Sequence, residues 1–325
     1  MNTKILQVLV KRPVKEQESL VGYTSFRLGG PAKWMVEVET VEELQSVLSL
    51  AKQEGIRFVV LGGGTNMLVS DKGFDGVVIR LLMREYHIKE NYVWAQAGLP
   101  TVAVARAAGE AGLSGLEWAV TLPGTIGGAV RGNAGCFGSE MKDTLVSATL
   151  LRDGETVEVK NEDLAFGYRD SLLKHTNDIL LDATFKLTQG DHAKIQETMQ
   201  TYLQKRRETQ PASGGSAGCM FKNYAMRSDE EQERLSALLD LPQSMVEKRM
   251  ISTGWLIDHL GLKGLRIGDA QVSEQHGNFL WNAGKATAED MRALIFFIKT
   301  KAREAYGIEL EEEVQMIGFD NVPLS

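Results

Sequence analysis

The sequence predicts an α+β fold, and three of its features lead to that prediction. The chain has 325 residues, more than one hydrophobic core usually accommodates, so we expect two or three domains. Helical and strand-like segments are mixed along its length. Asp153-Gly154 separates the apolar runs Val146–Arg152 and Thr156–Val159, which is the pattern of an antiparallel hairpin. Hairpins among helices favour α+β domains over a doubly wound parallel sheet.

Composition and charge argue against several classes of protein. The chain is 43% hydrophobic and 24% charged, which is ordinary for a globular protein. Its net charge of −7 argues against a nucleic-acid partner, although main-chain N–H groups could still bind an anion. The 2 cysteines are too few for a disulfide framework, and the 5 histidines lack metal-ligand spacing, so we expect no metal site. No apolar run has the length of a membrane span or a signal peptide, which predicts a cytoplasmic protein without a membrane partner.

The first helix is predicted for Val41–Glu54, where Thr40 and Glu43 form a capping-box pattern and Gly55 ends the helix. The glycines of the segment that follows neither lead into a Rossmann helix nor precede the Gly-Lys-Ser/Thr of a P-loop. Taken alone, they are most often a tight turn. The segment is predicted to contain the strand Ile56–Leu61, the loop Gly62–Asn66, the apolar run Met67–Ser70, the turn Lys72–Gly76 and the strand Val77–Leu82.

A second glycine cluster follows the predicted helix Thr101–Ala111. It reads LPGTIGGAVRGNAG, from Leu122 to Gly135. A backbone with so few side chains suits the close approach of a ligand, although an irregular structural loop would have the same composition. Two such clusters in one half of the chain favour a dinucleotide site.

The second half of the chain contains further helices and strands. Because side chains alternate along a strand, we expect Glu311 and Glu313 on one face of the last strand and Glu312 on the other. The predicted elements are the strand Ile179–Leu187, the amphipathic helix Asp191–Arg207, an exposed, charged and helix-prone insertion at Arg227–Met250, a helix from the Thr287 cap to about Tyr306, and the strand Glu309–Ile317.

Three polar groups outside the glycine clusters could carry chemistry. Arg169, in the sequence Tyr-Arg-Asp-Ser, offers a fork for a carboxylate or phosphate, but most surface arginines are simply solvated. Cys219 lies among small residues, where a cysteine is most often a packing residue. The third group is the run Glu311-Glu312-Glu313, which includes Glu313. A carboxylate there, beside the apolar end of the last strand, is either desolvated or part of a charged edge strand. None of the three groups decides the function by itself.

Taken together, seven motifs resemble those of the UDP-N-acetylenolpyruvoylglucosamine reductase family, flavoproteins of bacterial cell-wall synthesis. The span between Phe166 and Arg206-Arg207 is short. In this it resembles the compact subtype of that family, whose members lack an added tyrosine-bearing substrate loop. The resemblance runs nearly from end to end, in the family's order: FRLGG (Phe26–Gly30), GGGTN (Gly62–Asn66), PGTIGGAVRGNAG (Pro123–Gly135), FGYRDS (Phe166–Ser171), AGCMFKN (Ala217–Asn223), GLKG with RIGDAQVSE (Gly261–Glu274) and LEEEVQMIG (Leu310–Gly318).

The resemblance implies a two-part FAD-binding domain of the vanillyl-alcohol-oxidase/PCMH type and a C-terminal α+β substrate-binding domain. Residues 1–82 and 307–325 would form the first FAD-binding subdomain, residues 83–208 the second, and residues 209–306 the substrate domain, with the insertion at about 227–250. FAD and NADPH are the implied cofactors. The implied FAD-binding residues are Arg27, Gly62, Gly63, Gly64, Thr65, Asn66, Pro123, Gly124, Thr125, Gly127, Gly128, Asn133, Ala134 and Gly135.

The resemblance also implies a reaction. NADPH would reduce FAD, and the reduced flavin would give hydride to the enolpyruvyl methylene of a UDP-sugar, yielding UDP-N-acetylmuramate for peptidoglycan synthesis. Arg169 would hold the substrate carboxylate and Glu313 would help to polarise it. Cys219, where many members carry serine, would donate a proton to the adjacent carbon. We expect a thiol that is mostly protonated at neutral pH, with activity falling as it ionises.

The resemblance makes Tyr168, Lys222 and Asn223 substrate contacts, but the chain departs from the family beside them. The family usually reads Phe-Lys-Asn-Pro, whereas Tyr224 stands in the place of the proline, and the charged segment Arg227–Met250 replaces a shorter connection. Two other functions remain open. One is a flavin oxidase of small alcohols with the same glycine loops, and the other is a sugar-nucleotide binder without catalysis. The sequence does not indicate the oligomeric state.

Overall fold

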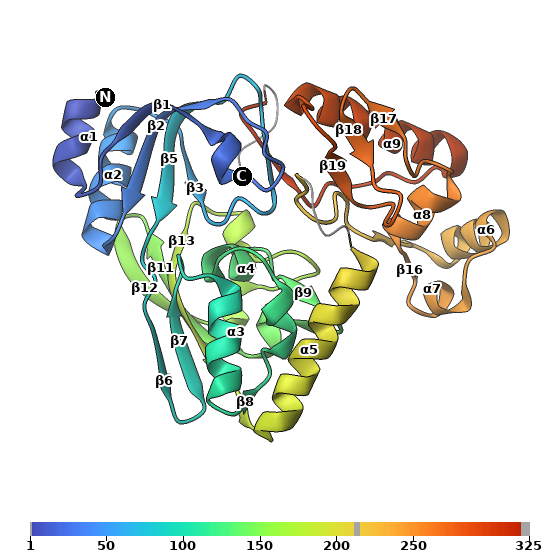
Figure 1. The fold of residues 1–325 in the computed structure, drawn as a ribbon, viewed down its shortest axis with the longest axis horizontal. Helices are drawn as coiled ribbons and strands as arrows, with labels where there is room; N and C mark the ends of the chain where they lie inside the picture. The colour runs from blue at the N-terminus through green and yellow to red at the C-terminus, as the bar shows by residue number, and fades with distance from the viewer. Residues whose placement is uncertain (1, 211–214, 320–325) are drawn as a thin grey trace.

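A computed structural model describes residues 2–210 and 215–319, which fold into three lobes (Figure 1). The first lobe holds a four-stranded sheet in the order β1-β2-β5-β3, in which β2, β5 and β3 are parallel and β1 is antiparallel. Helices α1 and α2 pack beside it. Its elements are α1 (Thr3–Leu9), β1 (Lys15–Ser19), β2 (Pro31–Val38), α2 (Val41–Gln53), β3 (Phe58–Leu61), β4 (Met67–Val69) and β5 (Phe74–Leu81).

The first sheet is buried on both faces, as parallel strands usually are. Alternate residues of β2 therefore join different apolar clusters: Trp34, Val36 and Val38 join a large one shared with the second lobe, and Met35 joins a small one. The small cluster is covered by a two-stranded parallel sheet of β4 and β20 (Gln315–Ile317). The end of the chain thus returns to the first lobe.

The second lobe is built on an antiparallel sheet in the order β12-β11-β13-β7-β6. The predicted hairpin is confirmed, since Arg152 pairs with Glu155 around a two-residue turn. Asp153 and Gly154 have φ of 51° and 89°, as the favoured primed turns require. The elements are β6 (Tyr86–Lys89), β7 (Tyr92–Gln96), α3 (Thr101–Glu110), β8 (Leu113–Ser114), α4 (Ile126–Arg131), β9 (Gly135–Cys136), β10 (Ser139–Glu140), β11 (Leu145–Arg152), β12 (Glu155–Lys160), β13 (Ile179–Lys186), β14 (Thr188–Gln189) and α5 (His192–Thr209).

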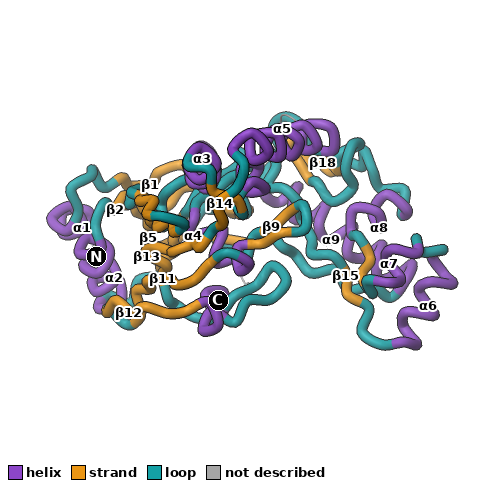
Figure 2. The backbone as a smooth tube through the Cα atoms, turned by 90° about the horizontal axis from the view of Figure 1, so that it is seen from below, coloured by secondary structure: helices purple, strands orange, loops and turns teal. Residues whose placement is uncertain are grey.

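The third lobe packs α8 and α9 against a three-stranded sheet around its own apolar cluster. Helix α9 has the predicted capping box of Thr287 with Asp290, and Gly307 ends it at φ 70°. Figure 2 shows α6 and α7 at the end of the molecule opposite to α1. The elements are β15 (Tyr224–Ala225), α6 (Asp229–Leu239), α7 (Gln243–Glu247), β16 (Met250–Ile251), α8 (Thr253–His259), β17 (Arg266–Ile267), β18 (Ala270–Val272), β19 (Leu280–Asn282) and α9 (Ala288–Tyr306).

The predicted domain boundaries remain a prediction, and the apolar clusters do not follow them. The large cluster joins Leu44 of the first lobe to Val93 of the second, so it spans the predicted boundary between residues 82 and 83. The third lobe's cluster includes Phe26 and Leu310, which lie outside 209–306. Residue 1, residues 211–214 and residues 320–325 belong to the predicted segments but lie outside the described residues.

Three predicted elements differ from those in the structure. The strand predicted for Glu309–Ile317 is regular only at Gln315–Ile317, where it pairs with β4, while Glu312 forms an isolated bridge with Phe221. The predicted turn Lys72–Gly76 already enters β5 at Phe74, whose side chain is buried. At α2, Thr40 accepts a hydrogen bond from the Glu43 N–H, but the Glu43 carboxylate binds the N–H groups of Lys11 and Glu39 and so does not complete the capping box.

The inserted segment Arg227–Met250 is helical and largely exposed, as predicted, but it is also folded onto the third lobe. Leu235 and Leu239 of α6 are buried in that lobe's cluster. Tyr224, the residue in place of the family's proline, pairs with Ile251 in the β15–β16 ladder, and its hydroxyl donates to Glu231 of α6 at 2.7 Å. The departure from the family motif and the insertion therefore form one packed unit. None of the helices in the described ranges has both the length and the apolar character to span a membrane.

Replacing Tyr224 with Phe should lower the free energy of unfolding by about 1–2 kcal/mol, because the Glu231 carboxylate would lose its hydroxyl donor. Urea unfolding of the purified protein measures the change. The matched control is Tyr86→Phe, at a tyrosine that is 45% exposed, where we expect no change. Equal stabilities of the two variants would show that the hydroxyl does not anchor the inserted unit.

Candidate active site

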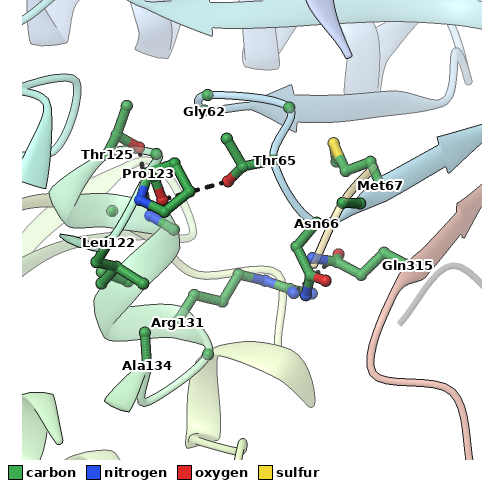
Figure 3. Close-up of a pocket in the computed structure, with 18 of the residues that line it drawn as sticks. Gly62, Thr65, Asn66, Met67, Leu122, Pro123, Thr125, Arg131, Ala134 and Gln315 are labelled. Atoms are coloured by element: carbon green, nitrogen blue, oxygen red, sulfur yellow. Dashed lines mark hydrogen bonds between the residues drawn. The ribbon is translucent and has the colours of Figure 1, made fainter. Parts of the chain in front are cut away.

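A cavity of about 1220 Å³ lies where the lobes meet. Both glycine clusters line it, together with the end of α5, the segment before β15 and the C-terminal segment. Figure 3 shows Thr65 and Asn66 on one side and Pro123 and Thr125 on the other. The predicted residues that line the cavity are Gly62, Gly63, Gly64, Thr65, Asn66, Pro123, Gly124, Thr125, Gly127, Gly128, Ala134, Gly135, Arg169, Cys219 and Glu313.

The two glycine loops approach each other too closely for side chains. A Cβ on Gly63 would lie 2.7 Å from the Cα of Gly124, and one on Gly64, at φ 61°, would clash with the carbonyl oxygen of Tyr23. Thr65 Oγ1 donates to the Pro123 carbonyl at 3.4 Å, which joins the loops. Among the hydrogen bonds of the described residues, none is donated by the main-chain N–H of Gly62, Gly63 or Gly64. These N–H groups line a cavity and suit the pyrophosphate of a dinucleotide such as FAD.

The second glycine cluster contains a short helix, which we predicted as loop. Thr125 caps α4 by accepting a hydrogen bond from the Gly128 N–H at 3.4 Å. Gly127 lies against β7's end, where its N–H donates to the Ala97 carbonyl at 2.9 Å. Five glycines in so short a segment hide the helical pattern, because glycine disfavours helix interiors. Tertiary packing onto the sheet overrides that preference.

Two of the residues predicted to bind FAD are not among those that line the cavity, and their role in FAD binding stays a prediction. Arg27 is exposed, at φ 54°, and is not among the residues that line the cavity. Asn133 is completely buried, and its side chain donates to Glu140 and to the Gly167 carbonyl while accepting from the Lys142 N–H. In this structure Asn133 therefore supports the turn that carries Arg169.

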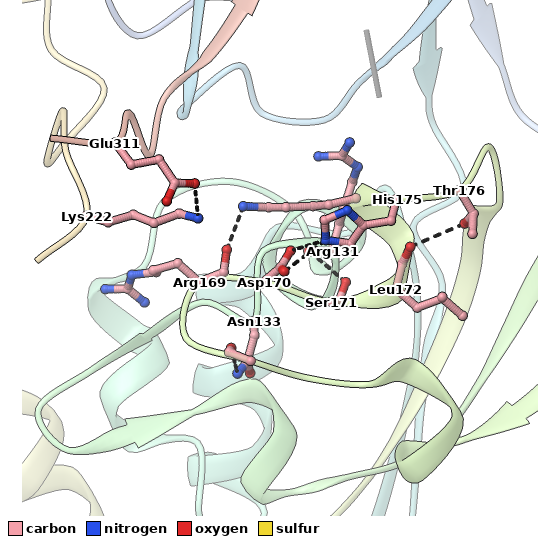
Figure 4. Close-up of polar contacts among 12 residues, drawn as sticks. Arg131, Asn133, Arg169, Asp170, Ser171, Leu172, His175, Thr176, Lys222 and Glu311 are labelled. Atoms are coloured by element: carbon pink, nitrogen blue, oxygen red, sulfur yellow. Dashed lines mark hydrogen bonds and ion pairs between the residues drawn. The ribbon is translucent and has the colours of Figure 1, made fainter. Parts of the chain in front are cut away.

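Arg169 lies in a tight turn that is fixed from several sides. Its φ is 56°, and Gly167 and Asp170 bridge across it. Lys174 donates from Nζ to the Arg169 carbonyl at 2.6 Å, and Ser171 Oγ donates to the Arg131 carbonyl at 2.7 Å (Figure 4). A left-handed arginine is uncommon and costs energy, so these contacts hold the guanidinium in place.

The guanidinium of Arg169 meets the carboxylate of Glu313. Nε lies 3.1 Å from Oε1 in an ion pair, with the side chains 26% and 18% exposed. Nε itself is buried and its N–H direction finds no hydrogen-bond acceptor in the described residues, so the contact is an ion pair without a regular hydrogen bond. Burial raises the pKa of Glu313, and Arg169, Lys174 and Lys222 oppose that rise. The pair is therefore a partly desolvated charge centre on the cavity wall.

Cys219 lies at the same end of the cavity. Burial raises the pKa of its thiol to about 12, Glu313 adds to the rise, and Arg169 and Arg206 oppose it. The thiol is therefore protonated at neutral pH, as we predicted. Its ionisation, however, lies far above the ordinary thiol range.

Tyr168, Lys222 and Asn223 form one side of this end of the site, next to the residues that line the cavity. The Tyr168 hydroxyl accepts a hydrogen bond from the Asn223 N–H at 3.4 Å. Lys222 pairs with Glu311, and Figure 4 shows this pair next to Arg169. Asn223 Oδ1 accepts from the Thr253 N–H at 3.1 Å, which ties the segment to α8.

Comparison with known proteins shows the family. Residues 210–317 match the C-terminal domain of UDP-N-acetylenolpyruvoylglucosamine reductase, and residues 32–160 match an FAD binding domain. The reductase of Synechococcus sp. (strain JA-3-3Ab) is 40% identical over 94% of this chain and 91% of its own. That of Clostridioides difficile (strain 630) is 36% identical over 97% of both chains. The chain belongs to the UDP-N-acetylenolpyruvoylglucosamine reductase family.

The crystal structure of the reductase from Thermus caldophilus is similar throughout, with a TM-score of 0.75 at 35% identity over 93% of this chain and 98% of that one. The match to an FAD binding domain covers both glycine clusters, and the match to the reductase C-terminal domain covers Cys219 and Glu313. This member of the reductase family is thus an FAD-dependent oxidoreductase. Its residues fit FAD by the close, N–H-rich approach of the two loops.

Sequence reasoning missed several cations of this reductase's cavity. One of them, Arg131, lies inside the second glycine motif but was not singled out, and the others belong to no motif. Lysine and arginine at helix ends are usually solvated, and only the tertiary structure places these side chains on the cavity wall. Within the described residues, no group of His, Cys, Asp or Glu could hold a metal ion. The missed cations that line the cavity are Arg131, Lys174, Arg206 and Arg207.

Replacing Gly63 with Ala should raise the dissociation constant for FAD at least tenfold, because the new Cβ would push the two glycine loops apart. Flavin fluorescence quenching on titration of the apoprotein measures the constant. Gly22→Ala is the control, since a Cβ there meets nothing within 4 Å. Unchanged FAD affinity in Gly63→Ala would contradict the assignment of these loops to the cofactor.

Proposed function

We propose that this protein reduces UDP-N-acetylglucosamine enolpyruvate to UDP-N-acetylmuramate with NADPH, in peptidoglycan precursor synthesis. The observation that carries the proposal is the meeting of Arg169, Glu313 and Cys219 at one end of a glycine-lined cavity. A flavin oxidase would not need a carboxylate-binding cation and a proton donor side by side. A binder without catalysis would not need the protonated thiol.

When bound, FAD supplies the hydride chemistry, taking hydride from NADPH and passing it to the enolpyruvyl methylene. The residues of this chain bind the substrate carboxylate and supply the proton. As hydride adds to the methylene, negative charge develops on the adjacent carbon and its carboxylate. Arg169 is a fixed guanidinium with a buried Nε, suited to hold that carboxylate. Glu313, whose pKa burial raises, helps to polarise the same carboxylate.

Cys219 donates the proton that completes the reduction. The Sγ–H bond breaks and a C–H bond forms at the carbon next to the carboxylate, while the proton is later replaced from solvent. A group that donates must carry its proton at working pH, and burial ensures this for Cys219. The neighbouring cations Arg169 and Arg206 oppose the rise in the pKa and so favour the thiolate that remains after proton transfer.

The rest of the substrate is assigned to the third lobe. Residues 209–306 form the proposed substrate domain, residues 1–82 with 307–325 and residues 83–208 the proposed FAD subdomains. Lys222 contacts the diphosphate or sugar in place of its partner Glu311, and Asn223 and Tyr168 position that end of the ligand. Glu311 is 69% exposed, so exchanging it for an anionic ligand costs little.

An anaerobic half-reaction tests the function. NADPH should bleach the flavin absorbance, and addition of UDP-N-acetylglucosamine enolpyruvate should restore it rapidly with formation of UDP-N-acetylmuramate. A flavin that reduces but stays reduced would refute the proposed substrate. Oxygen consumption as fast as the reoxidation by that substrate would instead support an oxidase.

Cys219→Ala should leave flavin reduction by NADPH unchanged and slow flavin reoxidation by the substrate at least hundredfold, because the proton donor is lost. Cys219→Ser, which keeps a protonated donor, should retain most of the rate. Stopped-flow absorbance separates the two half-reactions. Reoxidation at the wild-type rate in Cys219→Ala would remove Cys219 from the proposed mechanism.

The same variants carry a pH test. The protonated thiol is present below its pKa and lost as the pH rises through it, so a pKa of about 12 puts that loss beyond pH 10. Reoxidation by wild type and Cys219→Ser should therefore have matching profiles from pH 7 to 10. A basic limb near pH 8.5 in the wild type alone would mean an ordinary thiol pKa and contradict the burial argument.

A further inference from the structure

Arg131 is a cation of the cavity wall to which neither the sequence motifs nor the proposed reaction gives a role. It lies in the last turn of α4, and its Nη1 donates to Oε1 of Gln315 at 3.0 Å (Figure 3). Gln315 is neutral, so this bond orients the guanidinium without cancelling its charge. Burial lowers the pKa of Arg131, opposed by Asp170, and an arginine remains charged nonetheless.

The positions of both partners are fixed by the backbone. The Arg131 carbonyl accepts a hydrogen bond from the buried Ser171 hydroxyl at 2.7 Å, which ties it to the Arg169 turn. The Gln315 N–H donates to the Asn66 carbonyl at 3.0 Å, which ties it to the first glycine loop. Because the Arg131 guanidinium is fixed at both of its partners, it can stabilise a negative charge that develops nearby without first changing its own position.

Arg131 also lies at the reacting end of the cavity. Arg131 and Arg169 both contact the C-terminal segment, at Gln315 and at Glu313, which are two residues apart. Ser171, two residues beyond Arg169, donates to the Arg131 carbonyl and so links α4 to the Arg169 turn. If the proposed function holds, hydride leaves the flavin next to the carbon that Cys219 protonates. The ring of the flavin, and not its adenosine end, then faces this part of the wall.

We propose that Arg131, oriented by Gln315, is the fixed cation that favours the reduced, anionic form of the bound flavin. Hydride from NADPH brings two electrons and one proton to FAD, leaving NADP⁺ and a flavin with one added negative charge. A nearby guanidinium stabilises that charge and gives up no proton. Protein charge near the flavin ring is a general means of setting its potential.

The test is the two-electron reduction potential of the FAD-bound protein, measured by anaerobic titration against a reference dye. Arg131→Met should lower the equilibrium constant for reduction at least tenfold, which makes the potential about 30 mV more negative. Arg131→Lys keeps the charge and should stay within threefold of the wild type. Stoichiometric FAD binding is verified for each variant before titration.

Two substitutions at Gln315 separate charge from packing. Gln315→Glu keeps the shape but places a carboxylate on the guanidinium, so the potential should fall as in Arg131→Met. Gln315→Leu removes the bond and keeps the charge, so the potential should fall less than in Gln315→Glu. If Arg131→Met does not bind FAD, Gln315→Glu decides the question.

Unchanged reduction potentials in Arg131→Met and Gln315→Glu would overturn the proposal. A potential in Arg131→Lys that is as negative as in Arg131→Met would also overturn it. Because the titration contains no substrate, its outcome does not depend on the enolpyruvyl reaction. The two proposals can therefore fail separately. If the substrate does not reoxidise the reduced flavin, but Gln315→Glu lowers the reduction potential, the proposed function is refuted and the role of Arg131 is supported.

Discussion

The ion pair between Arg169 and Glu313 is the contact on which the reacting end of the cavity depends. It joins a turn of the second lobe to the C-terminal segment. That segment is fixed on both sides of the carboxylate, since the Glu313 N–H donates to the Met220 carbonyl at 2.8 Å and the Asn66 side chain donates to the Glu313 carbonyl at 3.0 Å. One residue is thereby bonded to all three lobes. Cys219, which precedes Met220, is held beside the pair by the same contacts.

The C-terminal segment follows an irregular path, so its three successive glutamates each form an ion pair with a different cation. Glu311 meets Lys222, Glu312 meets Lys299 of α9, and Glu313 meets Arg169. A regular strand would have placed Glu311 and Glu313 on one face. The pairs of Glu311 and Glu312 are partly exposed and contribute little stability, whereas the somewhat more buried pair of Glu313 with Arg169 lies on the cavity wall and affects its charge balance.

The electrostatics of the cavity follow from burying several cations around few anions. Burial raises the pKa of both Glu313 and Cys219, while Arg169 opposes the rise in each. Lys174 shows the reverse effect, since burial and the neighbouring Lys222 and Arg131 lower its pKa. The cations favour anionic ligands, whereas burial favours the protonated forms of Glu313 and Cys219. Both properties suit the proposed reaction, which adds hydride and then a proton to a carboxylate-bearing alkene.

The sequence alone determined what depends on neighbours along the chain. Local hydrogen bonds and backbone preferences explain the caps of α2 and α9 and the Asp153-Gly154 hairpin, so these features were predictable. The order of the two glycine loops is read directly from the sequence. The proposed catalytic set, Arg169, Cys219 and Glu313, was found through the family resemblance, because each residue type alone has common structural uses. Only the tertiary structure decided the helix inside the second glycine cluster, the supporting role of Asn133 and the bond from Arg131 to Gln315, 184 residues apart. The physical reason is that packing, burial and charge at these sites come from segments distant in sequence, which no local pattern records.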